Sequence, residues 1–163
     1  MLKKLSLLLI LFLTACGWHF KNGEQLPPEL RTLSFESADQ YSEMSRILRN
    51  QLLLNDVKIV DRQAGVAKLR LVGTSSESRV VSVFKQAREA EKSLALHVQA
   101  IVDMPNKGAY PLEVSVYRSF FDDSRAALAK SAEREMIMKD MYQQAAQQLI
   151  IKMAGLQKAV SNQ

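Results

Sequence analysis

The residue with the most distinctive chemistry is Cys16, because the residues before it are those of a lipid-attachment site. Two lysines near the N-terminus precede an apolar run over residues 5–13, which is too short to span a bilayer as a helix. Leu-Thr-Ala at residues 13–15 then places small side chains where a peptidase cuts before a cysteine that already carries diacylglycerol. We predict a removed signal peptide over residues 1–15. The alternative is an ordinary secretory signal with a chance cysteine.

The new N-terminus would then carry an S-diacylglycerol and an N-acyl chain such as palmitate on Cys16, and several acyl chains make membrane attachment stable. Gly17 favours the outer membrane, because an aspartate at that position favours retention in the inner membrane of many Gram-negative bacteria. Cys16 is also the only cysteine of the chain, so no internal disulfide can form. Trp18 and Phe20 either rest at the membrane interface or pack on the domain.

The remaining titratable residues do not form a catalytic or metal-binding pattern. His19 and His97 have no partner at the spacing of metal ligands, and no glycine-rich phosphate loop or nucleophile elbow is present. The carboxylate pair Asp122–Asp123 follows a predicted strand, where it is expected to cap or turn the chain. The sequence therefore predicts no catalytic residues, no metal site and no bound cofactor other than the lipid on Cys16.

The charge of the chain is mildly basic. The net charge of +5 falls to +3 once Lys3 and Lys4 leave with the signal peptide. Nucleic-acid binding requires clustered basic faces, which are absent, so a nucleic-acid partner is not expected. A small basic site for an anionic lipid or glycolipid is compatible with this balance.

The periodicity of the chain predicts one α+β domain that presents these residues. Alternating apolar residues predict strands at residues 30–36, 67–74 with a continuation to 84, 92–104 and 110–121, and residues 57–60 are expected to form a short extended segment. Apolar stripes of helical spacing lie at residues 40–54 and 132–153. Asp39 is expected to cap the first helix, and Gly155 to end the second in a left-handed conformation. The predicted fold is a two-layer sandwich of two amphipathic helices on one face of a four-stranded, mainly antiparallel sheet.

Aromatic and basic residues gather near the ends of two of these strands. Phe84 ends one strand region, and Arg118, Phe120 and Phe121 end the last one. Phenylalanine and arginine are enriched in the cores of protein interfaces, so these four residues are predicted to contact a partner. The alternative is that Phe120 and Phe121 simply alternate, one in the core and the other half exposed.

Several strings of this chain together resemble the family of the LPS-assembly lipoprotein LptE. Each string is short, but their order and spacing match the family from Cys16 to about Met153. The strings are Cys-Gly-Trp-His-Phe at 16–20, Arg-Ile-Leu-Arg-Asn-Gln-Leu at 46–52, Ser-Val-Phe-Lys at 82–85, Tyr-Arg-Ser-Phe-Phe-Asp at 117–122 and Ala-Leu-Ala-Lys at 127–130.

The resemblance implies a protein that is not an enzyme. Members form a complex with the outer-membrane β-barrel protein LptD, sit inside that barrel as a plug, and help to place lipopolysaccharide in the outer leaflet. The family fold is two helices on a four-stranded sheet, with the lipid anchor on the periplasmic side. Basic residues linked to lipopolysaccharide contact in the family correspond to Lys85 and Lys130 here. Relatives carry arginine at the first position, and lysine keeps the charge without the two-point fit to phosphate.

The domain organisation follows from these predictions. Residues 16–28 form a lipidated tether, residues 29–155 a single domain and residues 156–163 a flexible tail. A different class of function also fits a lipoprotein of this size, namely binding of a small periplasmic ligand or a cell-wall component. That function requires a concave apolar pocket and a stable monomer, whereas a plug requires a polar and aromatic surface, because a barrel lumen is lined by polar side chains.

Overall fold

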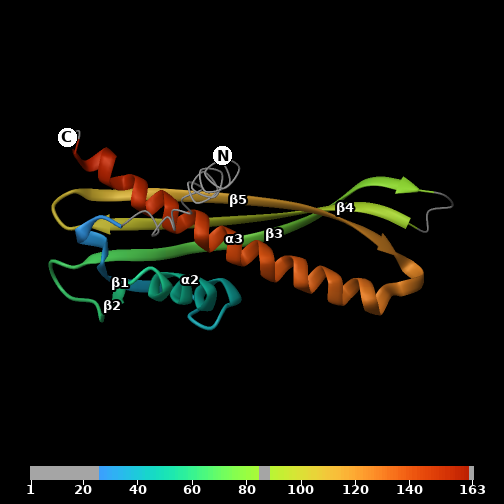
Figure 1. Cartoon of the computed structure of the whole chain (residues 1–163), viewed down its shortest axis with the longest axis horizontal. Coiled ribbons are helices and arrows are strands. Elements are labelled where there is room, and N and C mark those ends of the chain that lie inside the picture. Colours follow the sequence, from blue (N-terminus) through green and yellow to red (C-terminus); the bar gives the residue numbers. More distant parts are fainter. Residues whose placement is uncertain (1–25, 85–88, 162–163) are drawn as a thin grey trace, which may run out of the picture.

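A computed structural model of the chain describes residues 26–84 and 89–161 (Figure 1). The signal peptide, Cys16, most of the tether and Lys85 lie outside the described residues. The described elements are two short 3-10 helices, five strands and two α-helices, one of which lies between the first two strands. They are η1 (Pro28–Leu30), β1 (Thr32–Ser37), α2 (Glu43–Leu54), β2 (Lys58–Ile59), β3 (Ala67–Phe84), β4 (Glu89–Met104), β5 (Gly108–Asp123), η3 (Ser124–Ala126) and α3 (Ala127–Ser161).

The strands form one mixed sheet in the order β2-β1-β3-β4-β5. β1 pairs in parallel with β2 and with the first residues of β3, where Leu33 lies beside Ala67 and Ser37 beside Leu71. β3, β4 and β5 form an antiparallel meander along their whole length. We call the end at which β4 turns into β5 the proximal end. The distal end is the one at which β3 and β5 end and β4 begins.

The predicted fold class is confirmed, with one difference in the strand count. The short extended segment at residues 57–60 forms β2, a two-residue parallel strand that adds a fifth member to the sheet. The predicted continuation of the third strand to residue 84 is also confirmed. These long strands give the molecule its elongated shape, with α3 running diagonally across them and α2 beside the proximal half (Figure 1).

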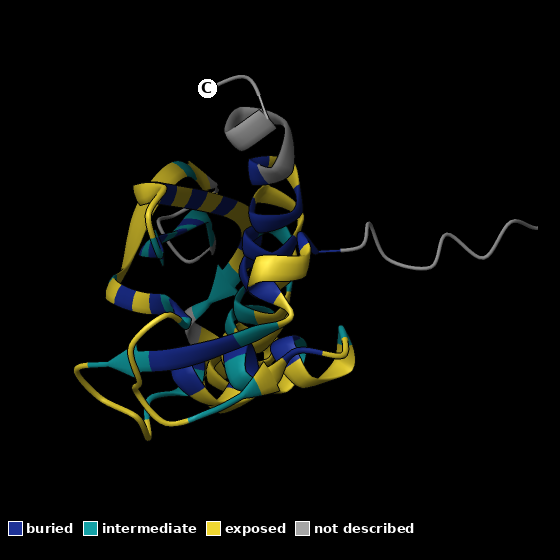
Figure 2. Cartoon of the chain, turned by 90° about the vertical axis from the view of Figure 1, so that its left-hand side faces the viewer, coloured by how far each residue is buried: buried dark blue, intermediate teal, exposed yellow. Residues whose placement is uncertain are grey.

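One hydrophobic core lies between the sheet and the helices. Alternate positions of the strands are buried, as the burial colours of Figure 2 show. Leu69 of β3, Val98 of β4 and Val114 of β5 are each at most 2% exposed, and they face the apolar stripes of the helices. The fully buried helix side chains of large volume are Met44, Leu48 and Leu52 from α2, and Met141, Leu149 and Met153 from α3. Leu26, in the predicted tether, is buried in the same core.

The start of α2 differs from the predicted one by a few residues. Ser42, not Asp39, is the N-cap, and its hydroxyl oxygen accepts a hydrogen bond from the backbone N–H of Ser45 at 3.3 Å. The carboxylate of Asp39 instead accepts from the backbone N–H of Tyr41, which makes a turn before the helix. Aspartate and serine can each act as an N-cap or form a turn, so the sequence alone does not decide which of Asp39 and Ser42 caps the helix.

The end of α3 differs more. The predicted stop at Gly155 is wrong, because the helix continues through this residue to Ser161. Leu156, one residue further on, is only 8% exposed and belongs to the core. Gly155 itself does not have a positive φ, and a Cβ atom added there would meet no other atom within 4 Å. The apolar stripe of the helix therefore outweighs the weak helix propensity of glycine.

This geometry predicts that Gly155→Ala stabilises the protein. Alanine in an exposed helix interior is favoured over glycine, so we expect the free energy of unfolding to rise by about 0.5–1 kcal/mol. Urea denaturation followed by circular dichroism measures the change. A left-handed glycine at this position would give the opposite sign, since alanine would then be strained, and a loss of stability would contradict the continuous helix.

Candidate functional site

The distal end of the sheet brings together residues that are far apart in the sequence. Phe84, the last residue of β3, pairs with Glu89 of β4, which in turn pairs with Asp123 of β5. Adjacent strands lie about 4.8 Å apart, so the end of β3 lies roughly 10 Å from the end of β5. The three residues of η3 separate Asp123 from the first turn of α3. The register therefore gathers the ends predicted to contact a partner, and Phe84 is the residue before Lys85.

The two phenylalanines near the end of β5 point to opposite faces of the sheet. Phe120 is 5% exposed and is part of the hydrophobic core, whereas Phe121 is 59% exposed. Alternation along a strand requires this difference once one of the two faces the helices. Phe121 therefore lies on the outer face of the sheet, and Phe120 packs in the core on the opposite face.

Arg118 ties the outer part of β5 to α3. Its guanidinium donates to the side-chain oxygen of Gln144 at 2.7 Å and to the carboxylate of Asp140 at 3.3 Å. A further N–H of the same group donates to the backbone carbonyl of Tyr117 at 3.2 Å. Arg118 remains partly exposed, so it both fixes the helix over the strand and offers charge at the surface.

Charged residues also determine how β5 turns into α3. Lys92 of β4 forms an ion pair with Asp122 across the sheet. Asp123 caps η3, and its carboxylate accepts from the backbone N–H of Arg125 at 2.9 Å. The predicted capping role of this carboxylate pair is thereby confirmed for Asp123. This backbone hydrogen bond, the hydrogen bond from the Arg125 side chain and the charges of Arg125 and Lys130 together hold the pKa of Asp123 below its ordinary value.

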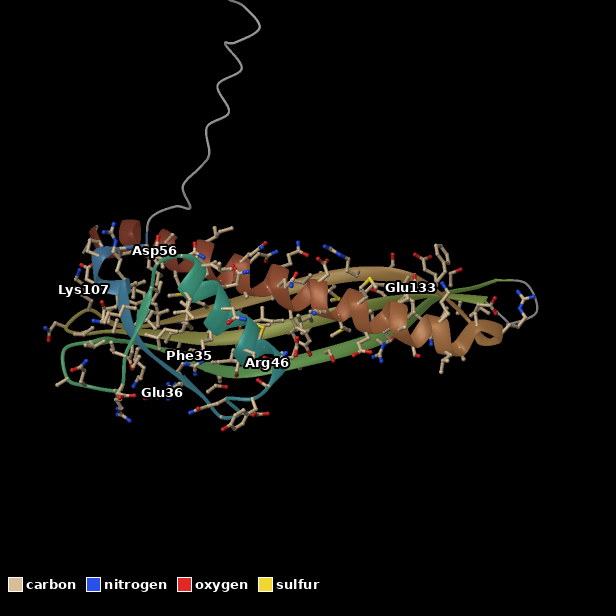
Figure 3. All side chains as sticks on the ribbon, turned by 60° about the horizontal axis from the view of Figure 1, so that its bottom comes forward. Phe35, Glu36, Arg46, Asp56, Lys107 and Glu133 are labelled. Carbon is tan, nitrogen blue, oxygen red and sulfur yellow. The ribbon has the colours of Figure 1, made fainter. Side chains whose placement is uncertain are left out.

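The first half of α3 extends beyond the core. Every buried residue of this helix lies at or after Met141, whereas Leu128 is 89% exposed and Met136 is 74% exposed. Lys130 lies in the first turn and forms an ion pair with Glu133 at 2.7 Å, one helical turn away. Figure 3 shows Glu133 on this half of the helix, at the end of the molecule opposite Lys107. The segment thus presents large apolar side chains and a lysine with no core beneath them.

The sheet face away from the helices carries polar side chains around the middle of β4 and β5. His97 of β4 hydrogen-bonds through Nδ1 to the Ser115 hydroxyl at 2.8 Å, and its ring meets that of Tyr117 edge to face, with centroids 5.9 Å apart. Gln99 donates to the carboxylate of Glu113 at 3.1 Å. His97 is thus part of a side-chain network on the outer face. Such a face suits contact with other polar side chains.

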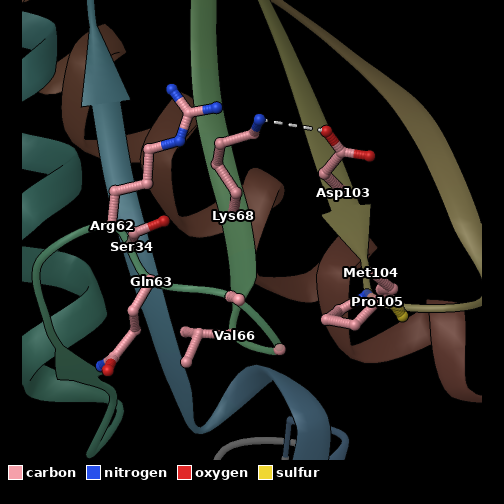
Figure 4. Close-up of a pocket in the computed structure, with 10 residues that line it drawn as sticks. Ser34, Arg62, Gln63, Val66, Lys68, Asp103, Met104 and Pro105 are labelled. Carbon is pink, nitrogen blue, oxygen red and sulfur yellow. Dashed lines mark ion pairs between the residues drawn. The ribbon is translucent and has the colours of Figure 1, made fainter.

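The pockets at the proximal end are lined by a mixture of polar and apolar residues. One, of about 560 Å³, lies beside the Lys68–Asp103 ion pair of 3.3 Å, with Arg62 on its rim (Figure 4). Another, of about 780 Å³, contains Arg49, whose guanidinium lies 5.2 Å from the centroid of the Phe35 ring. Neither has the apolar lining typical of a small-molecule site. Within residues 26–84 and 89–161, no group of three or more His, Cys, Asp or Glu side chains could hold a metal ion.

Sequence reasoning missed part of this site. Leu128 and Met136 are exposed apolar residues on α3, and Gln144 is the main partner of Arg118. The sequence predicts a helix that begins only at Ala132. Leu128 therefore lies outside the predicted helix, and its position on the helix surface could not be predicted.

No described helix combines the length and apolarity needed to cross a bilayer.

Comparisons with known proteins agree with this geometry. The family described as "LptE: Lipopolysaccharide-assembly" matches residues 30–153. The LPS-assembly lipoprotein LptE of Pectobacterium atrosepticum is 42% identical over 148 residues, covering 90% of this chain and 80% of the relative. The protein of the same name from Yersinia pestis is 43% identical over 145 residues, covering 88% of this chain and 70% of the relative.

Solved structures share the fold. The rare lipoprotein B of Shewanella oneidensis superposes with a TM-score of 0.74 at 38% identity, covering 80% of this chain and 98% of that one. A minor lipoprotein of Acinetobacter baumannii has the same fold, with a TM-score of 0.64 at 15% identity.

The fold defines a small α+β protein in which two helices cover a five-stranded sheet. The chain belongs to the LptE family of lipopolysaccharide-assembly lipoproteins. That membership also confirms that it is not an enzyme.

The opposite orientations of the two phenylalanines give a paired prediction. Phe120→Ala removes a buried ring and is expected to lower the free energy of unfolding by about 3–5 kcal/mol. Phe121→Ala truncates an exposed ring and is expected to change it by less than about 1 kcal/mol. Chemical denaturation of both variants measures the difference, and equal costs would contradict the assignment of the faces.

The environment of Asp123 predicts how this carboxylate titrates. Its folded-state pKa lies below its unfolded-state pKa, so the stabilisation is present above the unfolded-state pKa and is lost as the pH falls through the folded-state pKa. We expect Arg125→Ala to raise the pKa of Asp123 toward its ordinary value. A carboxyl-detected NMR titration measures both proteins. Identical pKa values in the two would show that the side chain of Arg125 does not stabilise the charged carboxylate, because the backbone N–H of residue 125 is kept in the variant.

Proposed function

We propose that this protein is the outer-membrane plug and assembly partner of the β-barrel protein LptD. In this role it binds lipopolysaccharide and helps to place it in the outer leaflet. The observation that supports the proposal most is the family match over residues 30–153, because it spans nearly all of the described domain. The distal end of the sheet supplies the contact surface that such a subunit requires.

The contact with the barrel is assigned to Phe121, Arg118, the end of β3 at Phe84 and the first half of α3. Phe121 and the first half of α3 are fixed relative to the sheet by the β4–β5 register and the Arg118 contacts, and Phe121, Leu128 and Met136 are exposed. Exposed rings and arginine on a rigid support have the composition of interface anchors. The polar face around His97 suits the polar wall of a barrel lumen.

The lipid on Cys16 holds the chain on the periplasmic side of the outer membrane. Leu26, buried in the core, anchors the tether ten residues later. An extended chain spans at most about 3.3–3.6 Å per residue, so the lipid lies within roughly 36 Å of the domain. This reach allows the domain to enter a partner barrel while the acyl chains stay in the inner leaflet.

Lipopolysaccharide contact is assigned to Lys130 and Lys85. Lipid A carries phosphates, and lysine binds phosphate as a compact point charge. Lys130 forms an ion pair with Glu133, and ion pairs at the surface are worth little. A phosphate can therefore replace this carboxylate at low cost.

Co-purification tests the proposal as a whole. The full-length chain, tagged at its C-terminus, is extracted in a mild detergent that preserves outer-membrane complexes. We expect a large barrel protein to accompany it in a defined ratio, identified by mass spectrometry. A chain that elutes alone under these conditions would overturn the assignment of a barrel partner.

The assignment of the two lysines gives a separate prediction. Lys85→Glu combined with Lys130→Glu is expected to weaken binding to lipopolysaccharide on the order of tenfold at low salt, with the fold unchanged. The matched control is Lys58→Glu combined with Lys139→Glu, which changes the net charge equally at two exposed positions elsewhere. Equal losses in both double variants would mean that only net charge matters, and unchanged binding would remove the two residues from the site.

A further inference from the structure

β3 has two different edges along its length. Its first five residues pair with β1, ending where Ser37 lies beside Leu71, and β1 then leaves the sheet toward α2. Of the other thirteen of its eighteen residues, Val72–Phe84, none pairs with a described strand other than β4. We call this stretch the free edge of β3. Its outward backbone N–H and C=O groups form no hydrogen bond with the described turns and loops.

The opposite edge of the sheet is protected. β5 contains Pro111, which has no N–H to offer to another strand. The ammonium group of Lys152, from α3, donates a hydrogen bond to the backbone carbonyl of Glu113. α3 also packs along β5 through the Arg118 contacts. Natural sheets use such devices to prevent edge-to-edge pairing, so their presence on β5 makes the open edge of β3 notable.

The side chains of the free edge favour strand pairing. Val72, Val80, Val81 and Val83 are each about half exposed, and valine has a high β-propensity. Between the valines lie serine and threonine, which are small enough for a neighbouring strand to approach. Irregularities at Val72 and Val81 flank a regular stretch, Gly73–Val80. The regular stretch is therefore where an added strand would fit best.

Two charges within this stretch make it self-complementary. Glu77 and Arg79 lie on the same face of the sheet, with Ser78 between them at the midpoint of the free edge. An antiparallel copy of the strand centred on Ser78 would pair the whole free edge with itself. The same register places Glu77 of each copy opposite Arg79 of the other, twice in a two-fold symmetric pair.

We infer that the free edge of β3 pairs with the same edge of a second copy of this chain when no barrel partner is bound. The register that covers the edge completely is also the one that neutralises both charges. The two five-stranded sheets then form one continuous sheet through the main chain, as in β-augmentation. The inference rests on this edge and its charges, and it does not depend on the proposed function.

Charge reversal tests the pairing. The full-length chain in mild detergent is studied by analytical ultracentrifugation over a range of concentrations. Glu77→Arg alone or Arg79→Glu alone converts two attractive cross-strand pairs into two repulsive ones, so we expect each to weaken association on the order of tenfold. The double variant restores complementarity and is expected to associate like the original chain. Circular dichroism verifies that every variant is folded.

Disulfide trapping fixes the register. In the proposed pair, Ser78 lies directly opposite Ser78 of the other copy, within the distance at which a disulfide can form. Ser78→Cys is therefore expected to give a covalent dimer under mild oxidation. Ser76→Cys is the matched control, because the two introduced thiols would be about 13 Å apart along the strands. Both are made on a Cys16→Ala background, so that the introduced thiol is the only one.

Three outcomes would overturn the inference. They are a chain that remains monomeric at concentrations up to about 1 mM, a double variant that associates no better than the single ones, and cross-linking that is equally efficient at positions 76 and 78. The monomeric chain would show that the copies do not associate. The double variant would show that Glu77 and Arg79 do not pair, and the equal cross-linking would show that the register is wrong. None of them bears on the co-purification of a barrel, so failure here and failure of the proposed function can be distinguished.

Discussion

The antiparallel register of β3, β4 and β5 is the constraint on which the rest of the structure depends. Each of these strands has sixteen or more residues, which is long for a small domain, and the pairing holds from the proximal turn to the distal end. The register decides which side chains face the helices. A slip by one residue would turn Val98 and Val114 outward and would bury His97 and Ser115.

The two halves of these long strands differ in how far the helices cover them. Over the proximal half, both helices cover the sheet and supply the fully buried side chains of the core. Over the distal half, α2 is absent, and α3 has no buried residue before Met141. The distal half is therefore less covered by helices than the proximal half, and the free edge of β3 lies on this distal half.

Much of the fold could be predicted from the sequence, because strand alternation and helical stripes are local signals. The class, the two helices and the three long strands follow from residues such as Leu69, Val98 and Met141. The short parallel strand β2 could not be assigned, since two residues carry no period and its pairing with β1 depends on the position of α2. The end of α3 was misjudged because a glycine at position 155 signals a stop only when no apolar residue beyond it reaches the core, as Leu156 does.

The site was predicted less completely than the fold. The sequence shows aromatic and basic residues near the ends of predicted strands. Only the register shows that β3 at Phe84 and β5 at Asp123 end at the same, distal end of the sheet. The choice between Phe120 and Phe121 required knowing which face α3 covers. The partners of Arg118 lie more than twenty residues away on α3, so no local pattern could identify them.

Hydrogen exchange tests the central claim most directly, namely that the distal half is the contact surface for a barrel partner. Exchange is measured by mass spectrometry for the chain alone and for the chain in its complex extracted from the outer membrane. We expect peptides covering residues 115–136 to gain strong protection from exchange in the complex, with smaller changes in the proximal loop at residues 60–66. Protection confined to the proximal loops, with no change at the distal end, would contradict it.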